Sequence, residues 1–387
     1  MVVKPEDYYD EETFARLKAF ADKQETPCLV VDKQTFTRQL DELMGCFPYA
    51  KTYYAIKANP MPELLEILRD RGCNFDVASR YELDKVLAQG VSGDRISFGN
   101  TIKKSRDIRY FYEKGVRLFA TDSEADLRNI AKAAPGAKVF VRILTEGSQT
   151  ADWPLSRKFG CQSDMALDLC IMARDLGLQP YGISFHVGSQ QRDIGAWDSA
   201  IAKVKVIFER LKEEDGIELK MINMGGGFPG NYITRTNDLE TYSAEITRFL
   251  KEDFGEELPE IILEPGRSLV ANAGLLASEV VLISRKDRNG LHRWVYVDIG
   301  KFGGLIETMD EAIKYPVFVE KQGEEEEVIL AGPTCDSADI LYEDYKYELP
   351  LNLASGDRVY WFSTGAYTTT YSAVEFNGFP PLASYCI

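Results

Sequence analysis

The feature that most constrains this chain is a repeated alternation of apolar runs with helix-like segments between residues 51 and 264. The apolar, β-branched runs end near Lys57, Ser79, Asn100, Asp122, Ile143, Val187, Met224 and Glu264. The segments between them predict helices at 62–71, 80–89, 103–114, 124–134, 163–176, 193–214 and 240–253. Eight strands that alternate with helices are typical of a (β/α)8 TIM-type barrel. The pattern alone leaves a doubly wound open sheet as the alternative.

Outside this repeat, the chain predicts a second domain that is rich in strands. Residues 1–25 predict a polar helical lead-in, residues 27–31 a buried strand and residues 34–45 a helix. Later strands are expected at 275–283, 292–299, 316–320, 328–331 and 359–362, with Asp287-Arg288-Asn289-Gly290 as a hairpin signal. We therefore expect a barrel over residues 34–272. An antiparallel β domain is expected over residues 273–387, joined by the N-terminal segment 1–33.

Composition excludes several classes of function. The net charge of −16 argues against nucleic acid or an anionic membrane as a partner. The longest apolar runs have the length of a strand, and the acidic N-terminus lacks the apolar core of a signal peptide. Seven dispersed cysteines without CxxC spacing predict reduced thiols in a cytoplasmic protein. With only His186 and His292, no histidine-rich metal site is expected.

Lys57 is the most informative single residue, in the stretch Tyr54-Ala55-Ile56-Lys57-Ala58-Asn59-Pro60. The carboxyl ends of barrel strands converge on one mouth, where catalysis takes place. A partly desolvated amine at such a position has a lowered pKa and forms a Schiff base with a carbonyl. A surface lysine at a strand end is the alternative, and it is the commoner situation for a lysine considered alone.

Other strand ends carry further polar residues that suit the same mouth. They include Asp76, Asn100, Asp122, Arg142, His186 and Glu264. Consecutive glycines at 225–227 let backbone N–H groups approach a phosphate, although a simple tight turn is equally compatible. The turn Glu264-Pro265-Gly266-Arg267 and the Ser189 hydroxyl extend this cradle.

An amine, a phosphate cradle and a carboxylate for a ring nitrogen together describe a pyridoxal phosphate site. Glu264 would hold the pyridine proton, and His186 would stack on the ring. A hydrogen-bonded core histidine is the alternative for His186.

Motifs along nearly the whole chain resemble the fold type III, alanine-racemase-like decarboxylases of basic amino acids. The motifs are YAIKANP (54–60), FDVAS (75–79), SFHVGS (184–189), GGGFPG (225–230), EPGR (264–267), GPTCDSAD (332–339), GAYT (365–368) and FNGF (376–379). The resemblance implies a barrel with a C-terminal β domain. The implied reaction is pyridoxal phosphate-dependent decarboxylation of ornithine to putrescine, and of lysine to cadaverine, in polyamine biosynthesis.

The resemblance also implies roles for the barrel residues. Lys57 would form the Schiff base with the cofactor, Glu264 would pair with its pyridine nitrogen and His186 would stack on its ring. Asp76 and Arg142 would position the reactive end of the cofactor. The residues implied around the phosphate are Ser189, Gly227, Gly266, Arg267 and Tyr367.

In this family the segment around Cys335 belongs to the active site of the partner subunit in a homodimer. Cys335 would then protonate the α-carbon after CO2 departs, and Asp336 would bind the distal amine of the substrate. Lys158 and Asp339 would form an ion pair across the subunit interface. Without the resemblance, Cys335 would be interpreted as a buried structural thiol.

The chain departs from the eukaryotic ornithine decarboxylases in the segment 304–311, which lacks their Tyr-Asp pair. Asp310, or Glu307 after a register shift, is expected to replace the carboxylate that reads the substrate amine. Phe302 stands where a tyrosine is usual. The pattern is similar to the bacterial group that handles both ornithine and lysine.

Other activities of the same fold stay open at this point. Arginine or diaminopimelate decarboxylation is one, although the latter typically uses a Cys-Glu pair where this chain has Cys335-Asp336. An amino-acid racemase would need a tyrosine in place of Cys335. A non-catalytic regulatory homologue usually loses the cofactor ligands, and Lys57, Glu264 and Arg267 are present here.

Overall fold

The computed structural model describes residues 3–145, 150–154, 158–288, 290 and 292–387. These residues form two compact units. The barrel unit comprises residues 40–229 and 237–266, and the β unit comprises residues 1–39, 230–236 and 267–387. The expected boundaries at 33/34 and 272/273 differ from these by a few residues. The segment 230–236 joins the β unit because its backbone bonds there: Asn231 N–H donates to Asn272, and Ser363 donates to the Asn231 carbonyl.

Eight parallel strands close into a barrel in the order β10-β11-β2-β3-β4-β5-β6-β8, which confirms the predicted TIM-type fold over an open sheet. The strands are β2 (Ala50–Ala55), β3 (Asn74–Val77), β4 (Ile96–Phe98), β5 (Leu118–Thr121), β6 (Lys138–Arg142), β8 (Gln179–Ser184), β10 (Met221–Asn223) and β11 (Glu260–Leu263). Closure occurs where β11 pairs with β2, with Ile261 opposite Ala50. Buried side chains of several strands, including Tyr53, Phe140 and Ile262, pack together as one apolar cluster.

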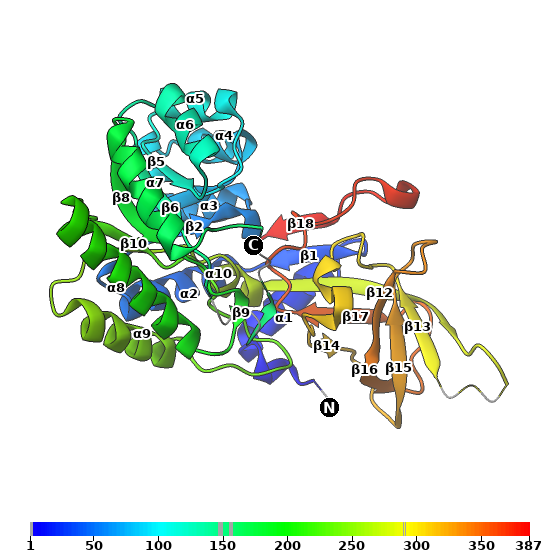
Figure 1. Ribbon diagram of the computed structural model, residues 1–387. Helices are drawn as coiled ribbons and strands as arrows, with labels where there is room; N and C mark the ends of the chain where they lie inside the picture. The colour runs from blue at the N-terminus through cyan, green and yellow to red at the C-terminus, as the bar shows by residue number, and fades with distance from the viewer. Residues whose placement is uncertain (1–2, 146–149, 155–157, 289, 291) are drawn as a thin grey trace. The chain divides into compact units, whose positions relative to one another are not determined.

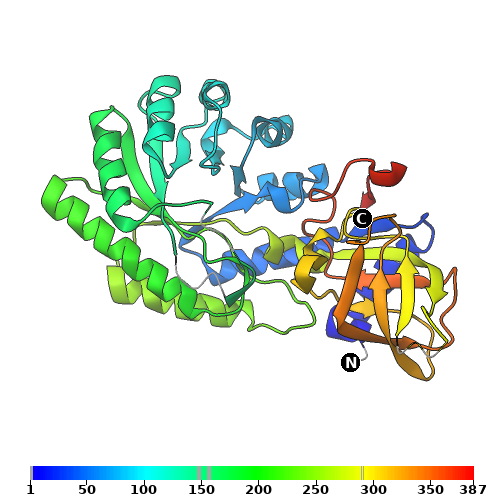
Figure 2. The same ribbon diagram turned by 45° about the vertical axis from the view of Figure 1, so that its right-hand side comes forward.

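The helices of the barrel unit lie outside the ring of strands, as Figures 1 and 2 show. They are α3 (Pro62–Asp70), α4 (Arg80–Ala88), α5 (Ser105–Glu113), α6 (Glu124–Ala133), α7 (Ser163–Asp175), α8 (Gly195–Asp215) and α9 (Leu239–Phe254). Pro62 occupies the first turn of α3, where a missing N–H costs nothing. Ser79 caps α4 by accepting the Glu82 N–H, while the Glu82 carboxylate accepts the Ala78 N–H at 2.6 Å.

Short elements complete the barrel unit. A single turn, η2 (Ile56–Ala58), follows β2, and η3 (Gly93–Arg95) precedes β4. Strands β7 (Ala151–Trp153) and β9 (Ser189–Gln191) pair antiparallel with each other. The segment 145–160 between β6 and α7 thus contains the strand β7, and its residues 146–149 and 155–157 lie outside the described ones.

The β unit contains one sheet, in which β14-β17-β12-β13-β15-β16 are neighbours and β1 pairs with both β12 and β18. Its strands are β1 (Cys28–Val31), β12 (Gly274–Ser284), β13 (Arg293–Val297), β14 (Val317–Phe318), β15 (Glu325–Ala331), β16 (Ile340–Pro350), β17 (Arg358–Phe362) and β18 (Ala383–Cys386). Helices α1 (Glu11–Ala21), α2 (Lys33–Cys46) and α10 (Arg267–Val270) and the turns η1 (Pro5–Asp7), η5 (Ala271–Ala273), η6 (Ile306–Glu311) and η7 (Phe376–Gly378) complete the described elements.

The sheet confirms that the early strand joins the second domain, since β1 pairs antiparallel with β12. The expected hairpin also forms, because β12 and β13 pair antiparallel, although Asn289 in its turn lies outside the described residues. The domain is mostly antiparallel. Two pairs, β13 with β15 and β1 with β18, are parallel, which the long connections between their strands permit. Strands β16 and β18 were not predicted, since β16 mixes charged residues among its tyrosines.

Two general features of the described residues bear on function. None of their helices is both long and apolar enough to cross a membrane. No group of three or more His, Cys, Asp or Glu side chains in the described ranges lies close enough to hold a metal ion.

Candidate active site

Lys57 lies in the turn η2, two residues beyond the end of β2 rather than on the strand itself. Its neighbours Ile56 and Ala58 are buried, whereas the lysine side chain is exposed. The buried Tyr54 hydroxyl donates to the Asn59 carbonyl at 3.0 Å, and Asn59 in turn accepts the Met61 N–H. These bonds fix the turn from both sides, so the backbone directs Lys57 beyond the carboxyl end of β2.

The turn after β11 lies directly against the Lys57 turn. The Ala55 N–H donates to the Pro265 carbonyl at 3.0 Å. A Cβ atom on Gly266 would come within 3.0 Å of the Ala58 side chain, which leaves little room for any residue but glycine. The structure thus brings the predicted Schiff-base lysine and the turn that carries Glu264 together, although about 200 residues separate them in sequence.

Glu264 is a partly buried carboxyl directly after β11. Burial and the nearby Asp76 raise its pKa to about 8, although Lys57 and Arg142 act in the opposite direction. Its Oε1 accepts a hydrogen bond from the Asn223 side chain at 2.5 Å. A cationic N–H partner would stabilise the ionised form of such a carboxyl most strongly, because it would offset the cost of ionising a buried group.

Asn223 orients Glu264 and the glycine turn together. Its side-chain oxygen accepts the Gly225 N–H at 2.9 Å, while its amide nitrogen donates to Glu264. Sequence reasoning missed this residue because it lies inside the apolar run that predicts β10. The detectable signal was a lone amide at the last position of a buried strand.

Asp76 lies on β3, and Ser97 of β4 donates to its Oδ1 at 3.0 Å. Burial raises the pKa of Asp76, against the opposing influence of Lys57 and of the Ser97 hydrogen bond. Ser97 is a second residue that the sequence did not single out. The two raised carboxyls, Asp76 and Glu264, interact electrostatically with each other and with Lys57, so all three belong to one cluster.

Two further side chains complete this cluster. Arg142 ends β6, and burial lowers its pKa while Glu264, Asp122 and Asp76 raise it, so the guanidinium stays charged. His186 lies two residues beyond β8. Burial, Arg142 and Lys57 all lower its pKa well below the ordinary value. Its Nδ1 accepts the Gly188 N–H at 3.0 Å, so the imidazole is neutral with its proton on Nε2.

The glycine turn 225–227 packs against both His186 and Glu264. A Cβ on Gly226 would lie 2.6 Å from the Glu264 carbonyl oxygen, and one on Gly225 would lie 2.5 Å from the Phe185 carbonyl oxygen. Gly227 has a φ of 102°, which L side chains rarely adopt. Only glycines allow the backbone to approach the neighbouring strand ends this closely. Ser189, predicted to add a hydroxyl to the cradle, begins β9 after the same His186 segment.

In the β unit, Arg267 begins α10 directly after the Glu264 turn in sequence. Its NH1 and NH2 donate to the two carboxylate oxygens of Glu307 at 2.7 and 2.5 Å. Both side chains are almost fully buried, with exposed fractions of 2% and 4%. Tyr367 lies beside the same guanidinium, 4.9 Å from its ring centroid to Cζ. Two predicted site residues, Arg267 and Tyr367, are therefore in contact.

Comparison with known proteins identifies this arrangement. The family model for the pyridoxal binding domain of pyridoxal-dependent decarboxylases matches residues 33–271. The chain belongs to this family. Its sequence is 33% identical to the lysine/ornithine decarboxylase of Selenomonas ruminantium over 365 residues, which cover 94% of this chain and 90% of that protein.

Solved structures agree with this assignment. The structure of SrLDC in complex with PLP and cadaverine has a TM-score of 0.87 at 31% identity, with 100% of this chain and 95% of that chain covered. The lysine/ornithine decarboxylase of Vibrio vulnificus, solved with cadaverine, has a TM-score of 0.87 at 29% identity, with coverages of 98% and 99%. The cofactor of this decarboxylase family is pyridoxal phosphate.

The barrel mouth of this chain fits that cofactor. An amine at Lys57, a desolvated carboxyl at Glu264 and a neutral imidazole at His186 match the aldehyde, the ring nitrogen and the ring face of pyridoxal phosphate. The Gly225 N–H is held by Asn223, and the rest of the glycine turn presents backbone to a phosphate with no side chain in the way.

The two carboxylates predicted to read the substrate amine have different environments. Glu307 is buried in its ion pair with Arg267. Asp310 is exposed and has a φ of 51°. Its neighbour Glu311 accepts three successive N–H groups, from Glu343, Asp344 and Tyr345, at 2.6–2.7 Å. Of the three acidic side chains in this stretch, Asp310 is the one directed to the surface.

Cys335 and Asp336 lie on an exposed loop between β15 and β16. The Cys335 N–H donates to the Asn377 side chain at 2.9 Å, which ties this loop to the FNGF motif. Cys335 is exposed, so the alternative of a buried structural thiol is wrong for this residue. Asp336 accepts the Ala338 N–H at 2.8 Å, which stabilises the turn.

Asp339 is 2% exposed and accepts the Lys301 N–H and both the N–H and hydroxyl of Thr334 at 2.7–3.1 Å. Lys158 is exposed. The expected ion pair between Lys158 and the partner's Asp339 stays a prediction. In that pair the Asp339 carboxylate would accept from Lys158 in addition to its bonds to Lys301 and Thr334.

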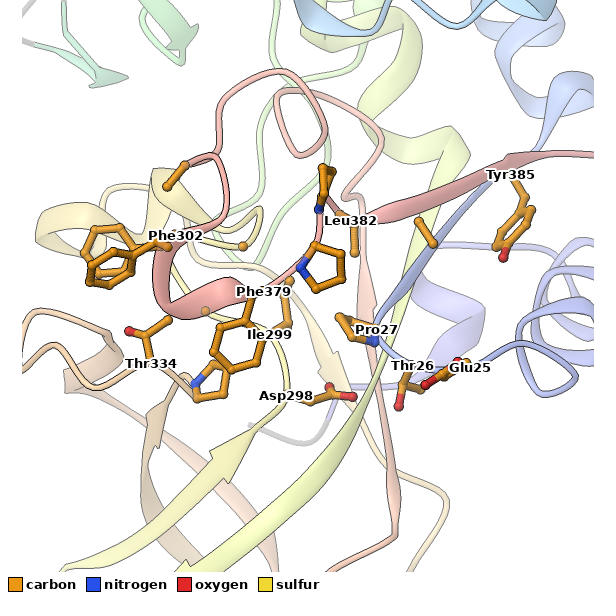
Figure 3. Close-up of a pocket in the computed structure, with 18 residues that line it drawn as sticks. Glu25, Thr26, Pro27, Asp298, Ile299, Phe302, Thr334, Phe379, Leu382 and Tyr385 are labelled. Atoms are coloured by element: carbon orange, nitrogen blue, oxygen red, sulfur yellow. The ribbon is translucent and has the colours of Figure 1, made fainter.

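A separate cavity of about 250 Å³ lies within the β unit, and Figure 3 shows its lining. Phe302, Phe379 and Leu382 form an apolar side, and the carboxylates of Glu25 and Asp298 lie at another. The Asp298 carboxylate accepts the Glu279 N–H at 2.8 Å. None of the predicted site residues lines this cavity.

Proposed function

We propose that this protein decarboxylates ornithine to putrescine and lysine to cadaverine, as a step of polyamine biosynthesis. The observation that carries the proposal is the cluster of Lys57, Asp76, Arg142, His186 and Glu264 at the carboxyl ends of the barrel strands. Two carboxyls whose pKa values are raised by burial, placed beside an amine at the mouth of a barrel, are typical of a catalytic site.

In this proposal Asp76 and Arg142 position the reactive end of the cofactor, and the other three residues of the cluster each have a distinct task. The Lys57 amine holds the aldehyde carbon of the cofactor. The Glu264 carboxyl, oriented by Asn223, keeps a proton at the pyridine nitrogen. The neutral His186 offers a flat face to the ring without adding charge. When bound, the cofactor accepts the electron pair that remains after CO2 departs.

The phosphate would be held by the Gly225–Gly227 turn, Gly266, Ser189, Arg267 and Tyr367. Glycine-rich turns present N–H groups to anions, and arginine binds phosphate oxygens through its planar fork. The contact of Arg267 with Tyr367 supports this grouping, since both residues then face one ligand.

Cys335 and Asp336 would act in the site of a partner subunit of a homodimer. A thiol is a competent acid for the α-carbon, and a carboxylate suits the distal ammonium of the substrate. Both residues lie on an exposed loop, and this exposure supports a role in the active site of the partner subunit.

The second carboxylate for the substrate amine is assigned to Asp310. Glu307 and Glu311 are each committed to internal partners, whereas Asp310 is exposed between them. A cytoplasmic location fits the seven cysteines, since each of them is a thiol in the part of the chain that the structure describes.

The decisive experiment measures kcat/KM for ornithine, lysine and arginine, with CO2 and diamine both quantified. We expect activity on ornithine and lysine and little on arginine. Inactivity on all three amino acids would contradict the proposal and favour a racemase or a non-catalytic homologue. In parallel, Lys57→Ala should abolish the visible absorbance of the bound cofactor, and an unchanged spectrum would exclude Lys57 as its attachment point.

A further inference from the structure

Glu307 and Arg267 form a closed, planar contact in the interior of the β unit. Each carboxylate oxygen accepts from a different terminal nitrogen of the guanidinium. This two-point geometry fixes the plane of the arginine as well as its position. The Glu307 carboxylate also holds the pKa of Arg267 well above its ordinary value, against the effect of burial.

Aromatic residues hold the same guanidinium on its other sides. The Tyr232 hydroxyl accepts from NH1 at 2.9 Å, and the Tyr367 ring centroid lies 4.9 Å from Cζ. Tyr232 belongs to the segment 230–236, which joins the β unit. Arg267 therefore has one defined orientation, and Glu307 supplies the charged part of the support.

Glu307 also anchors the segment that carries Asp310. The Ile313 N–H donates to the Glu307 carbonyl at 3.0 Å, and the Thr308 hydroxyl donates to the Leu305 carbonyl at 2.7 Å. At the other end of the segment, Glu311 is held by its three backbone N–H groups. Asp310 lies between two fixed points.

We propose that Glu307 is a positioning residue for the cofactor phosphate and not a reader of the substrate amine. Its carboxylate holds the Arg267 guanidinium in the orientation that binds the phosphate dianion. It also joins this anchor to the segment that presents Asp310. The inference rests on the proposed function, in which Arg267 is a phosphate ligand.

Neutralising Glu307 would change the affinity for the cofactor phosphate in opposite directions, depending on whether the residue acts through its charge or by orienting Arg267. If only charge mattered, removing an anion near the phosphate would strengthen binding. If Glu307 acts by orienting Arg267, its loss lets the guanidinium turn, and the preorganised phosphate contact is weakened. The sign of the change in phosphate affinity therefore separates the two.

The test measures the dissociation constants of pyridoxal phosphate and of pyridoxal, which lacks the phosphate, on the apoprotein. We expect Glu307→Gln to weaken pyridoxal phosphate binding about tenfold to a hundredfold, the loss of one well-aligned charged hydrogen bond, and to leave pyridoxal binding unchanged. Tyr232→Phe, which removes one neutral contact to the same guanidinium, should weaken pyridoxal phosphate binding less. This second variant keeps the test valid if Glu307→Gln does not fold.

A double-mutant cycle with Arg267→Met completes the design. In the Arg267→Met background, Glu307→Gln should have no further effect on cofactor affinity. Asp126→Asn serves as the matched control, since it breaks another buried ion pair, with Lys103, and should leave cofactor affinity unchanged. Unchanged or tighter binding by Glu307→Gln, or an equal loss without Arg267, overturns the inference. If Arg267→Met alone has no effect, the proposed phosphate role of Arg267 fails instead.

Discussion

The Asp76 carboxylate occupies the space that a side chain on Gly99 would need. A Cβ on Gly99 would come 1.9 Å from Asp76 Oδ1. Gly99 follows β4 and its N–H bonds to the Val77 carbonyl at 3.1 Å, so the backbone is held close to β3. Because Gly99 has no side chain, the Asp76 carboxylate can take its place in the cluster around Lys57.

Gly99→Ala should displace Asp76 and weaken cofactor binding about tenfold, because the overlap requires the carboxylate or the backbone to move. Gly45→Ala is the control. Gly45 lies in α2, and no atom lies within 4 Å of the position that its Cβ would take, so alanine there should raise helix stability slightly. Cofactor titration of both variants checks the prediction, and equal affinities would show that Asp76 is not needed in this position.

The raised pKa of Glu264 predicts a pH dependence of stability in the ligand-free protein. The ordinary carboxyl pKa lies near 4.5 and the folded value at about 8, so the folded state binds the extra proton between these values. Stability from this group is complete below about pH 4.5 and is lost as the pH rises towards 8, by an amount of the order of a few kcal/mol.

Glu264→Gln should therefore unfold at a higher temperature relative to the wild type at pH 8 than at pH 5. Some dependence will remain, because burial raises the pKa of Asp76 as well. Thermal melts of both apoproteins at the two pH values measure the difference. A difference of the opposite sign would mean that Glu264 is stabilised as a carboxylate.

Asp310→Asn should lower kcat/KM for ornithine and lysine about tenfold to a hundredfold, through loss of a charged hydrogen bond to the distal ammonium. Asparagine tolerates the positive φ of this position, so the backbone should be retained. The absorbance of the bound cofactor should not change. Asp344→Asn, another exposed acid of the β unit, is the control, and similar losses in both variants would assign the effect to surface charge.

Cys335→Ala should yield less diamine for each CO2 released, because the α-carbon loses its proton donor and protonation is diverted to another carbon. Cys46→Ala is the matched control, since that cysteine is only partly exposed and lies in α2. Measuring CO2 and diamine in the same reaction gives the ratio. A ratio of one for Cys335→Ala, at the wild-type rate, would remove this role from the thiol.

The amino-acid sequence by itself determined the barrel and the chemistry of its mouth. Apolar runs spaced by helix-length segments leave few alternatives to a closed parallel sheet. Polar residues at the ends of such runs, including Lys57, Asp76, Arg142, His186 and Glu264, then meet because parallel strands end on the same side. Each of these expectations depended on a local pattern, which is why it could be made without coordinates.

Only the tertiary structure decided which buried polar groups are partners. Nothing in the local sequence indicated that Asn223 orients Glu264, that Arg267 is paired with Glu307, or that Asp339 accepts the Lys301 N–H. The sequence favoured Asp310 and left Glu307 as the alternative after a register shift, and burial of Glu307 distinguished the two. The physical reason is that a buried charge must find its counterpart in space, often about 40 residues away in the chain, and sequence spacing does not encode that distance.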